Sequence, residues 1–245
     1  MRILSFDTSS HEIHVAVLED AQVLAQTVIG DTEGNTRQEA VAALMPTIVS
    51  LLGRAHCQRQ EIDCLVVGQG PGSFTGIRTA IVTARTLAQA MQLPLIAIPL
   101  FESYASGCEL PAAVILNAGR GRYFACPFRG LGLSDFESSM PAFSGTACEV
   151  SAYLVDVLRW YCDCAVADGF AGSAKNVCPL PVVENIATKQ AQIAWNRLCL
   201  NGNQATSPGV KAKTRESLLL RFPYDAVTPL YLRNPSITLK KSDGN

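Results

Sequence analysis

One arrangement of strands occurs twice in this chain. Residues 2–7 and 13–18 are short apolar runs separated by a polar turn, which is typical of an antiparallel strand pair. Residues 112–117 and 123–128 repeat this arrangement around the turn A-G-R-G-R. Helical and strand segments follow both predicted hairpins. The sequence therefore predicts an α/β fold of two related lobes.

The first predicted hairpin is extended by a strand at 22–29 and followed by an amphipathic helix at 36–53. A capping box, Thr36-x-x-Glu39, marks the start of this helix. Its apolar residues recur at helical spacing: Val41, Leu44, Met45, Ile48 and Leu52. Pro46 predicts a kink or an irregular first half, because proline removes a backbone donor.

A glycine-rich motif, G-Q-G-P-G-S-F-T-G-I-R, follows a predicted buried strand at 64–68. A strand, a glycine loop and a helix are also the context of a phosphate-binding loop. The motif lacks the G-K-[ST] of a Walker A loop and the spacing of a dinucleotide site. Its glycines suit a tight turn and a close approach of backbones. We therefore favour a packing role for the motif.

The helix predicted at 75–91 carries a seam of small and apolar residues. Their spacing of 4, 3, 4 and 3 resembles a coiled coil: Ile77, Ile81, Ala84, Ala88 and Met91. Gly76 and Ala80 add a flat, small-residue surface near the helix start. This pattern predicts an exposed, coiled-coil-like seam, whose flanking residues Arg78 and Arg85 could set register with a partner.

The remaining segments suggest the boundaries of the lobes. A strand at 95–98 and a short helix ending at 107 close the first lobe. The second lobe is expected to contain a helix at 149–161, a strand at 164–167 and a helix at 187–200. We predict a first lobe at 1–108, a reduced second lobe at 109–206, and a segment at 207–245 that packs back on the body.

Composition excludes several classes of protein. Apolar residues make up 48% of the chain and charged ones 17%, which is typical of a globular protein. The formal net charge of -1 provides no overall attraction to nucleic acid or anionic membranes. Nine cysteines without a C-x-x-C pair form neither a disulfide framework nor a zinc motif. With no long apolar run, the chain is expected to be soluble and cytoplasmic, without membrane partners.

The turn after the first strand is the best candidate for an ancestral phosphate loop. Asp7, Thr8 and Ser9 offer backbone donors, hydroxyls and a carboxylate for a phosphate or a metal ion. The alternative is that they are ordinary turn residues. The matching residue of the second hairpin is Asn117, and an amide cannot act as a base. This weighs against phosphoryl transfer.

The histidines provide no metal site or catalytic centre. His11 and His14 lie three residues apart in a predicted strand region, so their side chains would point to opposite faces. His56 stands alone after a helix. Since neither H-x-x-x-H nor G-x-S-x-G occurs, we predict surface or turn histidines, no catalytic residue and no metal ligand.

Taken together, four motifs resemble one family. They are R-I-L-S-F-D-T-S-S, the glycine motif, N-A-G-R-G-R-Y-F and P-L-Y-L-R, and they span nearly the whole chain. The sequence is similar to the TsaB family, whose members support synthesis of N6-threonylcarbamoyladenosine (t6A) in tRNA. The resemblance implies an actin/Hsp70/sugar-kinase-like fold of two RNase-H-like lobes. It also implies a non-catalytic subunit that binds and activates the transferase TsaD.

The resemblance further implies partners and a partner surface. TsaD and the ATPase TsaE would be the partners, with a homodimer when the chain is alone and tRNA contacted only through the complex. No cofactor of its own is expected, although ATP, ADP or Mg²⁺ could bind at an interface shared with TsaD. The helices at 36–53 and 75–91 would supply the contact residues: Val41, Leu44, Met45, Ile48, Gly76, Ile77, Arg78, Ala80, Ile81, Ala84, Arg85 and Ala88.

Three residues depart from the family pattern. Asn35 stands where many relatives have histidine, and Asn117 and Arg122 replace an acidic start and a glutamate in the second hairpin. These departures count against a retained nucleotide or metal site in Asp7, Thr8 and Ser9. The alternative function is an ATP-dependent phosphotransferase of the same fold, with Asp7 as the base or metal anchor.

Overall fold

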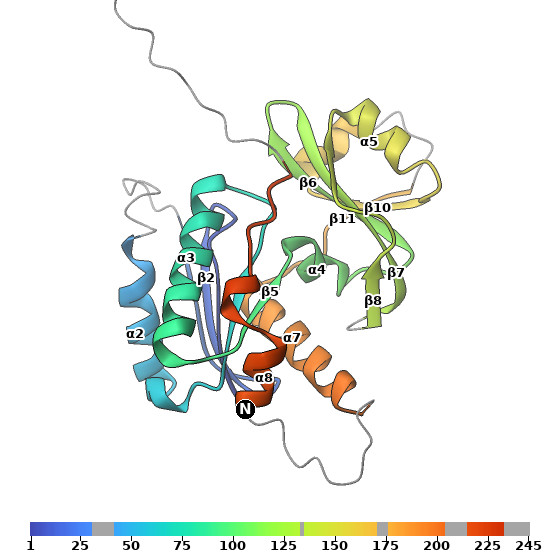
Figure 1. Ribbon diagram of the computed structural model, residues 1–245. Helices are drawn as coiled ribbons and strands as arrows, with labels where there is room; N and C mark the ends of the chain where they lie inside the picture. Colours follow the sequence, from blue (N-terminus) through green and yellow to red (C-terminus); the bar gives the residue numbers. More distant parts are fainter. Residues whose placement is uncertain (31–41, 133–134, 171–175, 204–214, 233–245) are drawn as a thin grey trace, which may run out of the picture.

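Two β-sheets organise the molecule, which is described by a computed structural model (Figure 1). The structure describes residues 1–30, 42–132, 135–170, 176–203 and 215–232. The predicted capping box, Asn35 and Val41 lie outside these residues. The two sheets with their helices confirm the predicted α/β fold class.

The first sheet has the strand order β3-β2-β1-β4-β5. The first three strands are antiparallel neighbours, and β4 and β5 add in parallel to β1. Their bounds are β1 (Arg2–Asp7), β2 (Ile13–Glu19), β3 (Gln22–Ile29), β4 (Cys64–Gly68) and β5 (Leu95–Ile98). Four of the five have the predicted bounds, and β2 is one residue longer than predicted.

The second sheet repeats this topology. Its order is β11-β10-β6-β7-β8, with β6, β7 and β8 antiparallel and β10 and β11 parallel to β6. Read from the other end, the sheet has the strand order of the first sheet. The bounds are β6 (Ala112–Gly119), β7 (Arg122–Gly132), β8 (Asp135–Ser138), β10 (Arg159–Cys162) and β11 (Asn176–Pro179), while the short β9 (Phe143–Gly145) pairs with β7. The repeated plan is therefore confirmed.

The helices cover both faces of the first sheet (Figure 1). α2 (Leu44–Arg54) and α3 (Phe74–Met91) pack on one face, where they share a core with the side chains of Leu4 and Phe6. α7 (Ile186–Asn203) lies against the opposite face, in the core that contains Ile3, and α4 (Leu100–Ala105) packs beside α7 in the same core. Alternating side chains of β1 thus serve two cores, as the strand period requires.

The last helix of each half crosses to the other half. α4 follows β5 of the first sheet and contacts β6 and β7 of the second. α7 follows β11 of the second sheet and contacts β1, β2 and β4 of the first. The range 109–206 predicted for the second lobe includes α7, but this helix packs on the first sheet. The boundaries of the lobes stay a prediction.

Two local predictions for the second half are wrong. The helix expected at 149–161 is α5 (Ala147–Tyr153), and β10 follows it. In β10, Trp160 and Cys162 are buried while their neighbours are half-buried, which is the alternation of a strand. The strand expected at 164–167 is instead α6 (Cys164–Ala167), whose first turn bonds to the carbonyl of Asp163.

The described part of the C-terminal segment, residues 215–232, packs back along the edge of the first sheet. It contains α8 (Arg215–Arg221) and the 3₁₀ turn η3 (Tyr224–Ala226). The carbonyl of Phe222 accepts from the backbone N–H of Leu95 at 3.2 Å, and Leu230 N–H donates to the carbonyl of Gln69 at 3.0 Å. Tyr231 then stacks on Phe74 at the start of α3, with ring centroids 4.7 Å apart.

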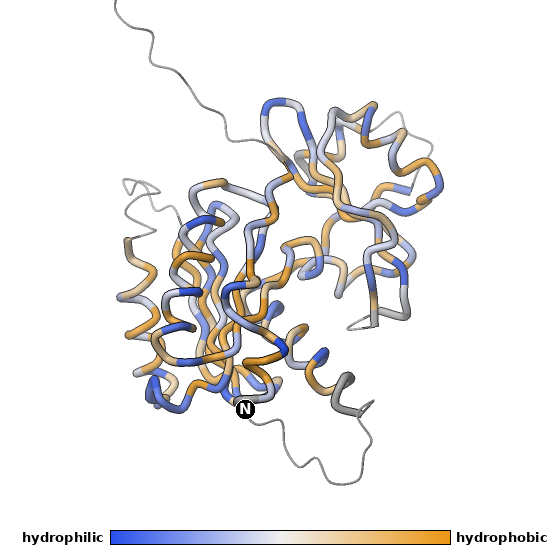
Figure 2. The backbone as a smooth tube through the Cα atoms, viewed as in Figure 1, coloured by the Kyte–Doolittle hydropathy of each residue, from blue (hydrophilic) through white to orange (hydrophobic). Residues whose placement is uncertain are grey.

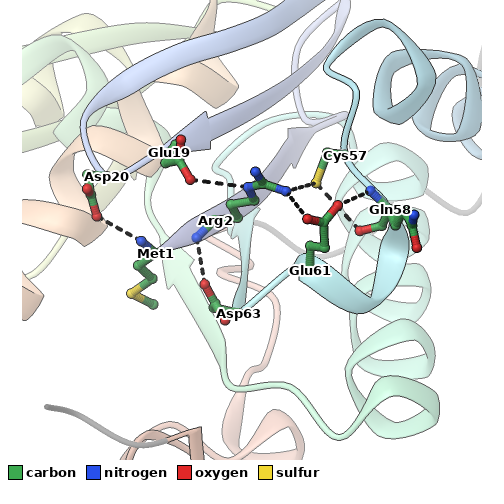
Figure 3. Close-up of polar contacts among 8 residues, drawn as sticks. All are labelled: Met1, Arg2, Glu19, Asp20, Cys57, Gln58, Glu61 and Asp63. Carbon is green, nitrogen blue, oxygen red and sulfur yellow. Dashed lines mark hydrogen bonds and ion pairs between the residues drawn. The ribbon is translucent and has the colours of Figure 1, made fainter.

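Polar contacts fix the start of β1 (Figure 3). Arg2 pairs with Glu61 of the turn η1 (Arg59–Glu61) at 2.6 Å and with Glu19 of β2 at 3.2 Å. Its backbone N–H donates to Asp63 at 2.7 Å. The side-chain contact with Glu19 is the largest of the influences that raise the pKa of Arg2. These contacts connect β1 with the chain that leads into β4.

The distribution of apolar residues follows this architecture (Figure 2). Apolar stretches run along the strands and the packed sides of the helices, whereas the tip of the β6–β7 hairpin is hydrophilic. Among the helices that the structure describes, none has both the length and the apolar character needed to cross a membrane.

Candidate functional site

The turn after β1 encloses the carboxylate of Asp7, which has no exposed surface. Its Oδ1 accepts hydrogen bonds from the backbone N–H and the hydroxyl of Ser9, both at 2.6 Å. Its Oδ2 accepts from the side-chain amide of Gln190 on α7, also at 2.6 Å. Both carboxylate oxygens are therefore engaged by donors of the protein itself.

The rest of the predicted phosphate loop is engaged in the same way. The hydroxyl of Thr8 donates to the carbonyl of Gly76 at 2.6 Å, and the carbonyl of Ser9 accepts from Ser73 N–H at 2.8 Å. Thr8 and Ser9 are as buried as Asp7. The structure thus brings the three predicted residues together, but it directs the hydroxyls of Thr8 and Ser9 toward protein acceptors.

The glycine motif permits this enclosure because its backbone passes close to the turn. A Cβ atom at Gly68 would lie 1.8 Å from Asp7 Oδ2, and one at Gly72 would lie 2.2 Å from the carbonyl oxygen of Ser9. Gly70 has a φ of +91°, which side chains of L-residues rarely adopt. These close approaches support the packing role inferred for the motif.

The start of α7 is joined to the first sheet by polar side chains. Asn185 caps the helix by accepting from Thr188 N–H at 3.0 Å, and its amide donates to the carbonyl of Thr27 at 2.9 Å. The hydroxyl of Thr188 donates to Gln26 of β3 at 2.7 Å. These contacts set the position from which Gln190 reaches Asp7.

His14 belongs to the same junction. It lies opposite Asp7 in the β1–β2 ladder and is buried, whereas a surface or turn position was expected. Its Nδ1 accepts from the backbone N–H of Ile186 at 3.4 Å. Burial lowers the pKa of His14, an effect that the charges of Asp7 and Glu12 oppose. The neutral ring is the form that accepts this hydrogen bond.

The equivalent turn of the second sheet has a different environment. Asn117 is exposed, and its Oδ1 accepts only from Gly119 N–H at 2.7 Å among the contacts described. Arg122 donates to the carbonyl of Ser144 at 3.2 Å and lies 3.8 Å from Glu149. No carboxylate occupies the position of Asn117, so this turn offers neither a base nor a metal ligand there.

The predicted partner face requires a correction. The seam of α3 was expected to be exposed, but it faces the protein's own sheet. Eight predicted contact residues are buried: Leu44, Ile48, Gly76, Ile77, Ala80, Ile81, Ala84 and Ala88. Small residues at this seam allow α3 to lie close to the strands. The coiled-coil-like spacing therefore reflects internal packing.

Other residues occupy the outer face of α2 and α3. Met45 and Val49 on α2 are 40% and 66% exposed, and Val82 on α3 is 56% exposed. Arg78 is exposed one turn before Val82, and Arg85 is half-exposed. Of the predicted contact residues within the described ranges, only Met45, Arg78 and Arg85 reach the surface.

No metal site accompanies these features in the ranges that the structure describes. Nowhere among those residues do three or more histidine, cysteine, aspartate or glutamate side chains converge as potential ligands. His11 and His56 are exposed and lie apart from the Asp7 turn. The buried thiol of Cys64 has its pKa raised by desolvation, so it is held as an inert thiol.

Comparison with known proteins gives a consistent result. A family model, TsaD, tRNA N6-adenosine threonylcarbamoyltransferase, matches residues 34–135. The tRNA threonylcarbamoyladenosine biosynthesis protein TsaB of Bacillus subtilis is 31% identical over 127 residues, which cover 51% of this chain and 53% of the relative. The protein of the same name from Escherichia coli is 33% identical over 107 residues, 44% of each chain. The chain thus spans about half the length of the curated relatives it matches.

The structural comparison extends over nearly the whole chain. YeaZ from Pseudomonas aeruginosa superimposes with a TM-score of 0.67 at 18% sequence identity. The alignment covers 94% of this chain and 99% of YeaZ. At this level of identity the likeness establishes a common fold, including the part of the second sheet from β9 to β11 that lies beyond the family-model match.

Proposed function

We propose that this chain, which is similar to proteins named TsaB, is a member of that family and acts in the synthesis of t6A in tRNA as a non-catalytic subunit. In this role it binds the transferase TsaD and activates it. The relatives named TsaB are biosynthesis proteins of this modification, which supports the proposal. The observation that carries it is the enclosure of Asp7 by Ser9 and Gln190.

The enclosed turn argues against the alternative phosphotransferase. A base or metal anchor must present an oxygen to its ligand, whereas both oxygens of Asp7 accept short hydrogen bonds and have no solvent exposure. The second lobe supplies Asn117 in place of another carboxylate. Opening the first turn would remove the short hydrogen bond of the buried Gln190 amide to Asp7 and leave only its 3.5 Å contact with the carbonyl of Ile98, at a cost of about 1–3 kcal/mol.

The outer face of α2 and α3 is the surface that we propose for TsaD. Met45, Val49 and Val82 expose aliphatic side chains there, and Arg78 provides a charge beside them. Methionine and arginine are enriched in protein interfaces, and exposed aliphatic side chains add apolar area that a partner can bury. This surface replaces the buried seam as the proposed contact region, on the same two helices.

The remaining partner assignments form part of the same proposal. TsaE would join the complex, and the chain alone would form a homodimer. ATP, ADP or Mg²⁺ would bind only at an interface shared with TsaD, because the Asp7 turn offers no free carboxylate oxygen of its own. Contact with tRNA would come through the complex, since the net charge of -1 gives no overall attraction to RNA.

The experiment is a reconstitution with TsaD from the same source. Complex formation is measured by sedimentation and t6A formation by nucleoside analysis of tRNA. Val49→Asp is expected to weaken the complex by about tenfold or more, because it buries an unpaired charge in the interface. Val182→Asp is the matched control, since Val182 is 93% exposed on the second lobe.

Two outcomes would contradict the proposal. If the unaltered chain does not increase TsaD-dependent t6A formation, the proposed function is wrong. If Val49→Asp and Val182→Asp bind TsaD equally well, the proposed surface is wrong. Ala84→Glu and Ile81→Arg are unsuitable for this purpose, because both positions lie in the core and their variants would unfold.

A further inference from the structure

A pocket of about 340 Å³ lies at the open edge of the first sheet, away from the Asp7 turn and from the outer face of α2 and α3. Its lining residues come from β5, from α7 and from the C-terminal chain between the end of α8 and Val227. Figure 1 shows where these elements lie. Such a volume is within the range of small-molecule sites in proteins.

The C-terminal segment limits what the pocket can hold. It is bonded to Leu95 at the start of β5 through Phe222, and to Gln69 beyond the end of β4 through Leu230. The side chain of Gln69 also donates to the carbonyl of Thr228 at 2.7 Å. Since the segment crosses the sheet edge at both ends of the pocket, an extended peptide has no room along the strand. The occupant must be a compact molecule.

The sheet edge contributes one peptide group to the pocket. Pro94 and Ile98 turn their carbonyls toward β4, where they accept from Leu65 and Gln69. Leu95 and Ala97 therefore turn their backbone groups outward, because alternate residues of a strand point to opposite sides. The N–H of Leu95 is occupied by Phe222. The backbone N–H of Ala97, which lines the pocket, makes no hydrogen bond to another backbone group among the described residues.

The walls combine apolar side chains with the polar side chain of Gln69 and carry positive charge at two places. Leu198, Ala194 and Val227 are buried lining residues, and none of the lining residues is acidic. Arg197 is neutralised by Glu102 at 2.8 Å. Arg221 is exposed, with its guanidinium 5.2 Å from the ring centroid of Phe222, and no carboxylate lies within ion-pair distance among the described residues. One uncompensated cation thus stands beside an apolar cavity.

We propose that this pocket binds a small organic acid with an apolar body. The carboxylate would pair with Arg221 and accept from Ala97 N–H, and the body would lie against Leu198 and Val227. Guanidinium groups bind carboxylates strongly and with defined geometry. The apolar walls favour a hydrocarbon body over a second polar group. This inference does not depend on the proposed role in t6A synthesis.

The test uses octanoate as the probe and octanamide as its neutral counterpart. Chemical-shift changes of the Ala97 amide in the full chain, followed by titration, give the site and the affinity. Octanoate is expected to bind at least about tenfold more tightly than octanamide, the factor that corresponds to a charge-assisted contact. Acetate, which lacks the apolar body, is expected to bind at least about tenfold more weakly than octanoate.

Variants assign the binding to individual groups. Arg221→Gln should weaken octanoate binding by about tenfold, whereas Arg120→Gln, which makes the same change at the tip of the β6–β7 hairpin, should leave it unchanged. Ala226→Trp, at an exposed lining position, should block the pocket without altering the core. Equal affinity for octanoate and octanamide, or no shift at Ala97 up to about 10 mM octanoate, would overturn the proposal.

Discussion

The two lobes have the same strand order but differ in the helices that cover it. After β4 the first lobe has the 18-residue helix α3, whereas after β10 the second lobe has only the four-residue α6. The helix that crosses onto the first sheet, α7, has 18 residues, and the one that crosses onto the second sheet, α4, has six. The second lobe is thus reduced in its helices while its sheet is retained.

This difference in helical cover determines whether each of the two equivalent turns is buried. In the first lobe the glycine motif before α3 and Gln190 of α7 enclose the Asp7 turn. In the second lobe Asn117 is exposed and caps its own hairpin. A repeated strand order therefore does not reproduce a site, because long-range partners from helices decide whether a turn is buried. The first turn should consequently be sensitive to substitution and the second tolerant.

The largest effect is expected for Gly68→Ala. The new Cβ would lie 1.8 Å from the carboxylate of Asp7. Either the Asp7 turn or the end of β4, where Gly68 lies, must therefore move. We expect the free energy of unfolding to fall by about 3 kcal/mol or more, measured by urea denaturation. Gly53→Ala is the control: it has open space and should stabilise α2 by up to about 1 kcal/mol. Equal stabilities for the two variants would show that the first turn is not tightly enclosed.

A smaller loss is expected for Asp7→Asn. The amide would retain one acceptor for Ser9, but its NH₂ group would face the donor of Gln190 until that side chain flips. The free energy of unfolding should fall by about 2 kcal/mol, because charge-assisted hydrogen bonds are replaced by neutral ones.

Asp156→Asn, on an exposed loop of the second lobe, makes the same chemical change and should alter the free energy of unfolding by less than about 0.5 kcal/mol. Both variants are followed by urea denaturation at neutral pH. If Asp7→Asn and Asp156→Asn lower the free energy of unfolding equally, the contacts of the buried carboxylate contribute nothing specific to the stability of the fold.

The strands could be predicted from the sequence more accurately than the helices. Residues 64–68 and 95–98 are short apolar runs bounded by polar or turn residues, and both predicted ranges match the structure. Residues 164–167 form an equally short apolar run, yet they fold as α6. A run of four residues has no measurable period, so contacts with Asp163 and the surrounding sheet decide its structure.

The seam of α3 illustrates a second limit. Spacing identifies which residues share a helix face, as it did for Ile77, Ile81 and Ala84. It does not identify what covers that face, because an internal sheet and a partner protein select the same small and apolar residues. The exposed Val49 and Val82 lie on the other side of their helices and follow no long periodic pattern.

The candidate site shows the same division between local and distant contacts. Asp7, Thr8 and Ser9 were grouped from one short motif, and the structure does bring them together. Gln190 was missed because it lies 183 residues away in sequence and carries no motif of its own. His14 was assigned to the surface or a turn, although it follows the apolar Ile13 at the start of β2.

His14 provides a pH dependence that distinguishes the first turn from the second. Burial holds its pKa below the value of about 6.5 in the unfolded chain. The unfolded state therefore binds a proton more readily than the folded state. The contribution of His14 to stability is complete above pH 6.5 and decreases as the pH falls toward the lower pKa of the folded state, by at most about 1.4 kcal/mol per pH unit.

This dependence is measured by urea denaturation between pH 7 and pH 5. His14→Asn should reduce the slope in that range, whereas His11→Asn, at an exposed position of the same hairpin, should retain it. Identical slopes for His14→Asn and the unaltered chain would show that His14 is not held neutral in the folded state.

The smallest effect is expected for Asn117→Ala in the second turn, where an amide lies at the position equivalent to the Asp7 carboxylate. Asn117→Ala removes the hydrogen bond from Gly119 N–H, but both groups lie in an exposed hairpin, so water can take the place of the lost acceptor. The free energy of unfolding should fall by about 0.5 kcal/mol in urea denaturation, with the cooperativity unchanged. A loss of about 2 kcal/mol, equal to that of Asp7→Asn, would mean that the second turn supports its lobe as strongly as the first. The contrast in helical cover would then not explain the difference between the lobes.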